Sequence, residues 1–191
     1  MDSSSVDFGE LYHEFHPKIM NYLNRLIRNS EVEDLAQEVF MKVAGALPNF
    51  KGESKLSTWI YKIATHTAMD RMRSPDFRRT HQIMADKLLA PADGPEWHAD
   101  ESVPVVEQLI KTEMNQCIRG NIDDLPEKYR TVLVLSELQE LRNREIAEIL
   151  DISLESVKIR LHRARGLLRG KLNVNCDFYH NSKSNLACVA K

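Results

Sequence analysis

The segment from Asn143 to Lys171 constrains the fold of this chain more than any other feature, because it encodes a helix, a short turn and a second helix. Apolar residues recur at helical spacing on both sides of the turn. We expect the first helix to span Arg144–Leu150, with Asn143 as its N-cap. Asp151–Ser153 would form the turn, and Ser153 would cap the second helix. The segment therefore predicts a helix-turn-helix.

The second helix concentrates positive charge. The whole chain has a net charge of −2, yet the stretch 158–171 contains no acid and six basic residues: Lys158, Arg160, Arg163, Arg165, Arg169 and Lys171. Such a local excess is typical of a surface that meets phosphates. The face opposite the apolar stripe is centred on Ile159 and flanked by Glu155, Ser156, Arg163 and Gly166. We predict that this face reads base edges in a major groove while the basic side chains beside it hold phosphates. A solvated basic surface helix is the alternative, although such helices usually interleave acids.

Composition narrows the class of protein. The 191 residues are 42% hydrophobic, with only seven glycines and seven prolines, which favours a helix-rich chain with real cores. No apolar run approaches the length of a membrane span, and the first residues do not form a secretory signal. Three cysteines, Cys117, Cys176 and Cys188, are too few for a disulfide framework and fit a reducing cytoplasm.

Three amphipathic helices are expected in the N-terminal half, over residues 7–29, 31–47 and 57–73. Pro17 can kink or divide the first helix. The second would bury Val32, Leu35, Ala36, Val39, Phe40 and Val43 and turn Asp34, Gln37, Glu38 and Met41 outward. A loop from Pro48 to Lys55 precedes the third helix, whose polar face carries Trp59, Lys62, His66, Asp70 and Arg73.

The middle of the chain loses helical periodicity. Residues 81–104 combine prolines with five acids and read as an acidic linker. Helical spacing resumes near residue 105, and Pro126 opens a further helix that leads into the helix-turn-helix. Residues from about Asn173 onward are polar and predict an irregular tail. No internal repeat and no β pattern of useful length are found.

Two parts of the chain resemble one known family. LPEKYRTVLVLSELQELRNREIAEILDISLESVKIRLHRARGLLRGKL resembles the promoter-binding domain of sigma-70-type factors, and DLAQEVFMKVAGALPNFKG with STWIYKIATHTAMDRMR resembles their other conserved domain. The two-domain plan is similar to the extracytoplasmic-function (ECF) class of bacterial sigma factors, over roughly residues 7–80 and 105–172. The resemblance implies an all-α fold of two small helical domains joined by a flexible acidic linker. The expected parts are residues 1–80, the linker 81–104, the domain 105–172 and a tail 173–191.

The resemblance also implies three groups of functional residues. Asp34, Gln37, Glu38 and Met41 would contact the polymerase, although an ordinary acidic helix face would look the same. The melted −10 promoter element would meet Lys51, Lys55, Leu56, Trp59, Lys62, His66, Asp70 and Arg73, where aromatic and cationic groups suit single strands. A half-buried structural role is the alternative for Trp59. The −35 element would meet Glu155, Ser156, Lys158, Ile159, Arg160, Arg163, Arg165 and Arg169.

Three positions depart from the family pattern. His66 stands where Asn is common, which bears on −10 preference. Ile159 replaces a serine in the recognition helix, and its apolar side chain suits a thymine methyl group. Asp151 stands where Gly is usual in the turn, and Asp tolerates the left-handed conformation better than most residues.

The partners implied by the resemblance are core RNA polymerase, promoter DNA and an anti-sigma factor, which is expected to be membrane-associated. The chain would be cytoplasmic or held at the inner membrane face by that inhibitor, and its acidic linker would either thread the RNA exit path or act as a soluble spacer. No catalytic constellation, cofactor, metal or small-molecule substrate is expected. A stand-alone helix-turn-helix regulator and a recombinase are the competing interpretations, but a regulator does not need residues 31–73 and a recombinase needs a catalytic centre.

The cysteines leave one question open. Cys176, His180 and Cys188 have a spacing that a metal or redox sensor could use, but a zinc site normally has four ligands and the tail offers no fourth. Cys117 is expected to be a small packed residue within a helix.

Overall fold

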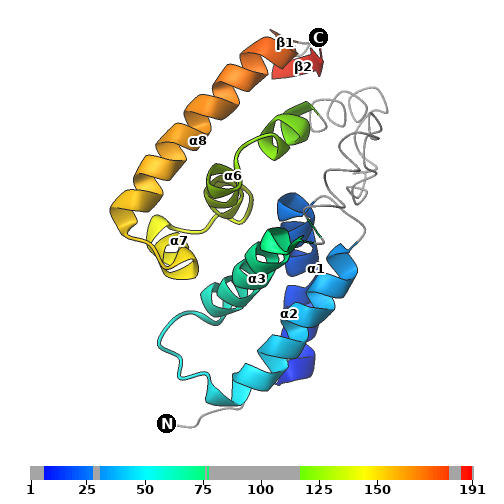
Figure 1. Cartoon of the computed structure of the whole chain (residues 1–191), viewed down its shortest axis with the longest axis vertical. Helices are drawn as coiled ribbons and strands as arrows, with labels where there is room; N and C mark the ends of the chain where they lie inside the picture. Colours follow the sequence, from blue (N-terminus) through cyan, green and yellow to red (C-terminus); the bar gives the residue numbers. More distant parts are fainter. Residues whose placement is uncertain (1–6, 28–30, 76, 78–116, 181–185, 191) are drawn as a thin grey trace.

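The computed structural model describes residues 7–27, 31–75, 77, 117–180 and 186–190 (Figure 1). The expected linker at 81–104 and the helix expected from residue 105 lie outside these residues. So do the domain boundaries expected near residues 80 and 104, which stay predictions. Within the described chain the all-α prediction is confirmed, apart from one two-stranded hairpin at the C-terminal end. None of the described helices is long and apolar enough to cross a membrane.

Three helices form the N-terminal half: α1 (Phe8–Leu26), α2 (Val32–Ala46) and α3 (Leu56–Arg73). A 3₁₀ turn, η1 (Leu47–Asn49), ends α2. The Asp7 side chain caps α1 by accepting from the backbone N–H of Glu10 at 2.9 Å. Pro17 does not divide α1, because it lies on the exposed side of the helix, where water can satisfy the carbonyl group that its missing N–H leaves free.

The described part of the C-terminal half starts with helical residues 117–123 and continues through α6 (Glu127–Leu133) into a π-helical turn, η2 (Val134–Leu138). The helix-turn-helix follows as α7 (Asn143–Leu150) and α8 (Leu154–Asn175). The predicted N-cap of α7 is wrong by one residue: Arg142 is the cap, because its backbone N–H bonds the Glu145 carboxylate at 2.8 Å. Asn143 is therefore already helical.

The C-terminal end departs most from expectation. The predicted irregular tail is wrong, because α8 continues to Asn175 and the chain then forms β1 (Cys176–His180) and β2 (Leu186–Ala190). These strands pair antiparallel, with Phe178 opposite Cys188. Cys117 forms a disulfide with Cys176, so it is not the simple packed residue that we expected.

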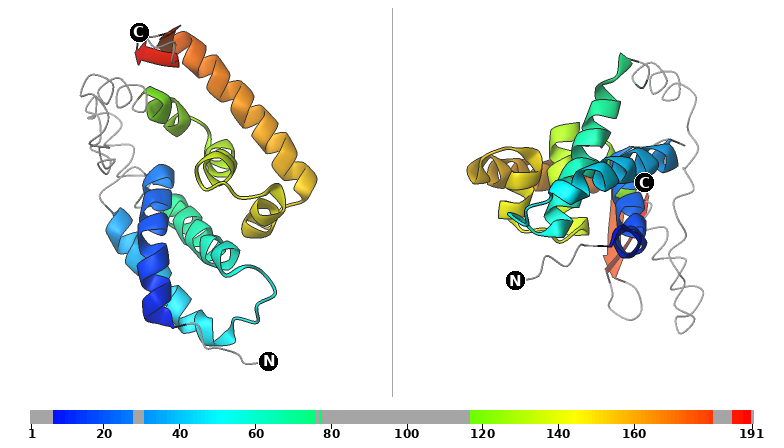
Figure 2. Two further views of the ribbon diagram at one scale, coloured as in Figure 1. Left: turned by 180° about the vertical axis from the view of Figure 1, so that it is seen from behind. Right: turned by 90° about the horizontal axis from the view of Figure 1, so that it is seen from below.

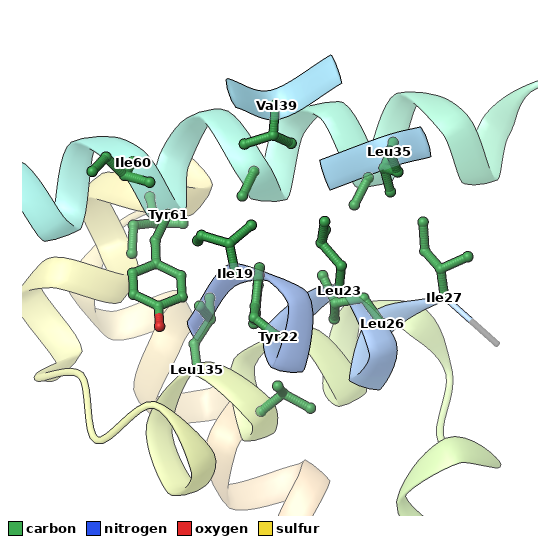
Figure 3. Packing of buried hydrophobic residues seen from close by; sticks show 14 of the residues in the cluster. Ile19, Tyr22, Leu23, Leu26, Ile27, Leu35, Val39, Ile60, Tyr61 and Leu135 are labelled. Carbon is green, nitrogen blue, oxygen red and sulfur yellow. The ribbon is translucent and has the colours of Figure 1, made fainter. Parts of the chain in front are cut away.

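One continuous core joins the two halves. The buried face predicted for α2 is confirmed residue by residue, and Ile60, Tyr61, Ala64, Ala68 and Met72 of α3 are buried as expected. Ile19, Tyr22 and Leu23 of α1 point toward α2 and α3 (Figure 3). The core continues through Leu135 of η2 into the C-terminal half. Each fully buried aliphatic side chain of this kind contributes about 1.5–3 kcal/mol.

Helix α3 is the central element of the molecule. It packs against α1 and α2 on one side and against α7 on the other, while α8 packs against α6 and α7 (Figures 1 and 2). A buried hydrogen bond of 2.7 Å joins the Tyr22 hydroxyl to Thr65 Oγ1, and Thr65 Oγ1 donates to the Tyr61 carbonyl at 2.6 Å. This arrangement places the polar face of α3 next to the turn of the helix-turn-helix.

Candidate nucleic-acid interface

The turn of the helix-turn-helix is fixed by local chemistry. Asp151 has φ 51° and ψ 45°, which is the left-handed conformation that lets the chain leave α7 sharply. Ser153 then caps α8, because its hydroxyl accepts from the backbone N–H of Ser156 at 3.1 Å. The predicted turn and the predicted Ser153 cap are therefore confirmed.

The outer face of α8 is open to solvent. Ile159 is 51% exposed, although isoleucine is usually buried. Glu155, Arg163 and Gly166 are exposed beside it, and Ser156 is half-buried next to its cap. The opposite stripe, Val157, Leu161 and Ala164, is buried against the rest of the C-terminal half. An exposed apolar side chain at the centre of a polar helix face is a candidate contact for a base methyl group.

The basic side chains of α8 differ in what already holds them. Arg165 donates two hydrogen bonds to Glu137 of η2, at 3.1 and 2.6 Å. Lys158 pairs with Glu155 one turn earlier, at 2.9 Å. A hydrogen bond from Arg163 to the Tyr129 hydroxyl lowers the pKa of that tyrosine. Arg165 is therefore bound to η2 and is not free to reach a phosphate in this arrangement. The sequence did not reveal this contact.

A groove of about 690 Å³ lies between the loop after η1 and the polar face of α3. Five of the residues predicted to meet the −10 element line it: Lys51, Trp59, Lys62, His66 and Asp70. Lys55, Leu56 and Arg73 are outside the lining. Lys55 caps the start of α3, Leu56 is its first residue and Arg73 is its last. The structure thus gathers most of the predicted single-strand contacts into one hollow.

An aromatic pair forms one wall of this groove. Trp59 is half-buried, and its ring lies 5.0 Å from that of Phe50 with an angle of 40° between the planes. The pair presents both a structural contact and a partly open aromatic surface, so each of the two roles considered for Trp59 has a physical basis. Phe50 was not among the predicted contacts, although an aromatic residue within the polar loop PNFKG was the available signal.

The two halves of the molecule meet over this groove. Lys62 Nζ lies 2.5 Å from Asp151 Oδ1, and His66 Nε2 donates to the Ile149 carbonyl at 3.0 Å. His66 also lies 3.4 Å from Asp151 Oδ2. Two groups that we assigned to single-stranded DNA are therefore bound to the turn of the helix-turn-helix.

Two further contacts extend this junction. Lys55 pairs with Glu145 of α7 at 2.8 Å, and the hydrogen bond from Lys55 holds the pKa of Glu145 below its usual value. The Tyr61 hydroxyl donates to Gln139 Oε1. These contacts join residues far apart in the sequence, so no local pattern could have indicated them.

The charge of the groove is balanced in this arrangement. Its lining contains three lysines, Lys42, Lys51 and Lys62, and three carboxylates, Glu53, Asp70 and Glu148. Glu148 comes from α7, the helix of the other half. If α7 moved away, the groove would lose that carboxylate and Lys62 would lose Asp151, so the surface would become more positive and better suited to a phosphate backbone.

The outer face of α2 forms a third candidate surface. Asp34, Gln37 and Met41 are exposed, and Met41 is 75% exposed despite its apolar side chain. Glu38 is half-buried and pairs with Lys42 at 2.8 Å. An exposed methionine among acids fits a protein contact, because methionine adapts to irregular apolar surfaces.

Comparison with known protein families finds two matches. A model described as Sigma-70 region 2 matches residues 11–78, which include most of α1, all of α2 and α3, and every residue of the groove lining except Glu148. A model described as Sigma-70, region 4 matches residues 115–168, which include the helix-turn-helix.

Curated relatives cover nearly the whole chain. RNA polymerase sigma factor SigZ of Bacillus subtilis (strain 168) is 36% identical over 181 residues, which are 92% of this chain and 95% of SigZ. ECF RNA polymerase sigma factor SigW of the same organism is 35% identical over 168 residues, 86% of this chain and 88% of SigW.

Solved structures share the fold. The sigma factor RpoE in complex with the anti-sigma factor NepR from Bartonella quintana has a TM-score of 0.66 and 21% identity, covering 88% of this chain and 98% of that one. CnrH in complex with the cytosolic domain of CnrY has a TM-score of 0.58 and 19% identity, covering 87% and 88%.

Proposed function

We propose, from the premise that this chain belongs to the ECF sigma factors of the sigma-70 family, that it binds core RNA polymerase and directs it to promoters with two separate DNA-reading surfaces. The observation that carries the proposal is the presence of both surfaces on one chain. The exposed face of α8 lies in the region 4 match, and the groove lining lies in the region 2 match except for Glu148.

The −35 contact is assigned to α8. Near the helix N-terminus, its outer face offers the exposed Glu155 and Ile159 and the half-buried Ser156, and this part of the helix enters the major groove in helix-turn-helix proteins. Ile159 would contact a thymine methyl group. Arg163 would read base edges beside Ile159. Arg160 and Arg169 would hold phosphates, and Lys158 and Arg165 would do so after exchanging their acidic partners.

The −10 contact is assigned to the groove. Lys51, Lys62 and His66 would meet the displaced strand, and Trp59 with Phe50 would offer a surface for a base. In the observed arrangement, Lys62 and His66 are bound to α7 and the turn. They would be free to meet the −10 element only after these contacts break, so the protein would not read the −10 and −35 elements together in this arrangement. The two halves would therefore separate when the protein engages polymerase and promoter.

The polymerase contact is assigned to the outer face of α2, around Asp34, Gln37 and Met41. Such a face combines an apolar anchor with acidic groups that steer the approach of a basic partner. Transcription chemistry would belong to the polymerase, and the chain would have no catalytic activity, cofactor or small-molecule substrate of its own.

Control by an anti-sigma factor fits the fold neighbours, which are described as complexes of sigma factors with anti-sigma factors. An inhibitor that holds this chain would cover the polymerase-facing surfaces. The protein would act in the cytoplasm, and a membrane-associated inhibitor would hold it at the inner membrane face.

In vitro transcription tests the proposal. Core polymerase with this protein and a promoter library should start transcription at sites that share two conserved elements and that core polymerase alone does not use. The Met41→Asp variant should lose these starts, because a charge replaces the apolar anchor of α2. Val174→Asp is the matched control, since Val174 is 70% exposed against 75% for Met41 but lies at the far end of α8. The proposal fails if wild-type protein adds no start sites to those of core polymerase.

A further inference from the structure

All three cysteines of the chain converge at one point, although 71 positions separate Cys117 from Cys188 in the numbering. Their Sγ atoms all lie within 4.8 Å of one another. Cys117 comes from the helical residues 117–123, Cys176 follows the last residue of α8, and Cys188 lies in β2. Neither DNA-reading surface uses this cluster.

The hairpin brings the third sulfur to the other two. Successive residues of a strand alternate between its faces, so Cys176 and Phe178 share one face of β1. Cys188 is paired directly with Phe178 across the hairpin and therefore lies on that same face. This register places Cys188 beside the Cys117–Cys176 disulfide, with its own thiol free.

Two of the three cysteines are buried, while Cys117 is half-buried. Cys176 is 2% exposed and Cys188 is 1% exposed. Burial raises the pKa of the Cys188 thiol.

A buried amide points its N–H group toward two of the three sulfurs. Asn121 is 5% exposed, and its Nδ2 group lies 3.8 Å from Cys117 Sγ and 3.7 Å from Cys176 Sγ. The same group donates to the Cys117 carbonyl at 2.8 Å, and Asn175 Nδ2 donates to Asn121 Oδ1 at 2.7 Å, which fixes the orientation of the amide. Amide N–H groups aimed at sulfur are what orient and stabilise thiolate ligands in metal sites.

We propose that, once the Cys117–Cys176 disulfide is reduced, Cys117, Cys176 and Cys188 bind one thiophilic metal ion through three thiolates. Zinc–sulfur bonds of about 2.3 Å at tetrahedral angles hold sulfurs roughly 3.8 Å apart, which the observed convergence accommodates. The fourth position would be taken by a ligand from solvent. Soft thiolates select ions such as Zn²⁺ and Cu⁺ over the hard cations.

Formation of the site needs two steps, reduction of the disulfide and binding of the ion. A dithiol reductant gives two electrons and two protons to the Cys117–Cys176 bond, which breaks into two thiols while the reductant becomes a disulfide. A divalent ion then replaces the three S–H protons, which pass to solvent. The bound ion would join residues 117–123, the end of α8 and the hairpin at one point, and this role is independent of the proposed promoter recognition.

Metal binding can be measured on the full chain without polymerase or DNA. The protein would be reduced anaerobically with a phosphine, stripped of metal and titrated with Zn²⁺ against a chromophoric chelator. We expect one Zn²⁺ per chain and, in an alkylation experiment on the same sample, protection of all three thiols by Zn²⁺. No Zn²⁺ uptake, or a Cys188 thiol that is alkylated equally fast with and without Zn²⁺, would overturn the proposal and leave a structural disulfide only.

A variant separates the metal site from the disulfide. Cys188→Ser removes one ligand but neither sulfur of the Cys117–Cys176 bond. Loss of a residue that only supports a ligand typically weakens metal binding roughly 10- to 100-fold, so loss of the ligand itself should weaken Zn²⁺ binding by at least that factor. The disulfide should still form on oxidation, which shows that the variant folds. Val174→Ser is the matched control, because Val174 is exposed and only two residues from Cys176. Equal affinity of Cys188→Ser and wild type would refute the three-thiolate site.

Discussion

The contact of Asp151 with Lys62 and His66 allows the separation of the two halves to be tested with one substitution. Asp151→Gly removes the carboxylate that lies 2.5 Å from Lys62 Nζ and 3.4 Å from His66 Nε2. Glycine adopts the left-handed backbone conformation at this position without strain, so the turn and α8 should keep their geometry. Asp151→Asn is a graded companion, because its amide oxygen can still accept from Lys62.

The expected size of the effect follows from exposure. The Lys62 and Asp151 side chains are 35% and 57% exposed, so solvent screens their attraction and the pair contributes at most about 1 kcal/mol. A change of about 1 kcal/mol alters the ratio of separated to closed molecules roughly five-fold. If only the separated form binds a single strand, the apparent affinity for that strand rises by the same factor while the closed form dominates.

Fluorescence anisotropy with a short labelled single strand gives this affinity, and small-angle scattering of the free protein gives its compactness. We expect Asp151→Gly to bind several-fold more tightly than wild type and to be less compact. The difference in compactness should shrink at high salt, since an exposed ion pair is screened there. Glu148→Gln is the charge-matched control, because it removes one negative charge from the groove lining but keeps the Lys62 and His66 bonds. If Glu148→Gln tightens binding as much as Asp151→Gly, or if neither compactness nor affinity changes, the closed arrangement does not restrict access to the groove.

Three other outcomes are expected. Ile159→Ser should change the preferred −35 sequence in a promoter-library assay while polymerase binding stays the same, and an unchanged preference would remove Ile159 from base recognition. Tyr22→Phe should lower the free energy of unfolding by about 1 kcal/mol in urea denaturation, because it removes a buried bond to Thr65, which keeps its own bond to the Tyr61 carbonyl. Burial raises the pKa of Tyr61 from 10.0 to about 12. The neutral hydroxyl that bonds Gln139 therefore contributes fully to the free energy of unfolding below pH 10, and this contribution is lost as the pH approaches 12. Tyr61→Phe should flatten this part of the profile of stability against pH, and an equally steep profile in the variant would assign it to another group.

Local patterns predicted most of the helical structure. The buried stripe of α2 followed from spacing alone, and the turn at Asp151 with its Ser153 cap followed from the chemistry of these two residues. Both features depend on neighbours within one or two turns, where side-chain spacing and capping are informative.

Features that depend on long-range contacts were not predictable in this way. Lys62 and Asp151 are 89 positions apart, and Cys117 and Cys176 are 59 apart. The sequence did contain a weak signal for the hairpin. The polar run 181–185 has turn composition and lies between the two short segments that form β1 and β2. This turn signal was weaker than the helical periodicity of α8.

The shared core has a consequence for the life of the free protein. Leu135 is fully buried, and Tyr61 is 5% exposed and bonded to the C-terminal half. Separation of the two halves would bring both side chains into water and create an adhesive apolar surface. The closed arrangement would therefore protect a newly made molecule from self-association and from proteases until a larger partner covered these residues. Abundance in the cell would then depend on the supply of such partners, because unoccupied open molecules are the ones removed.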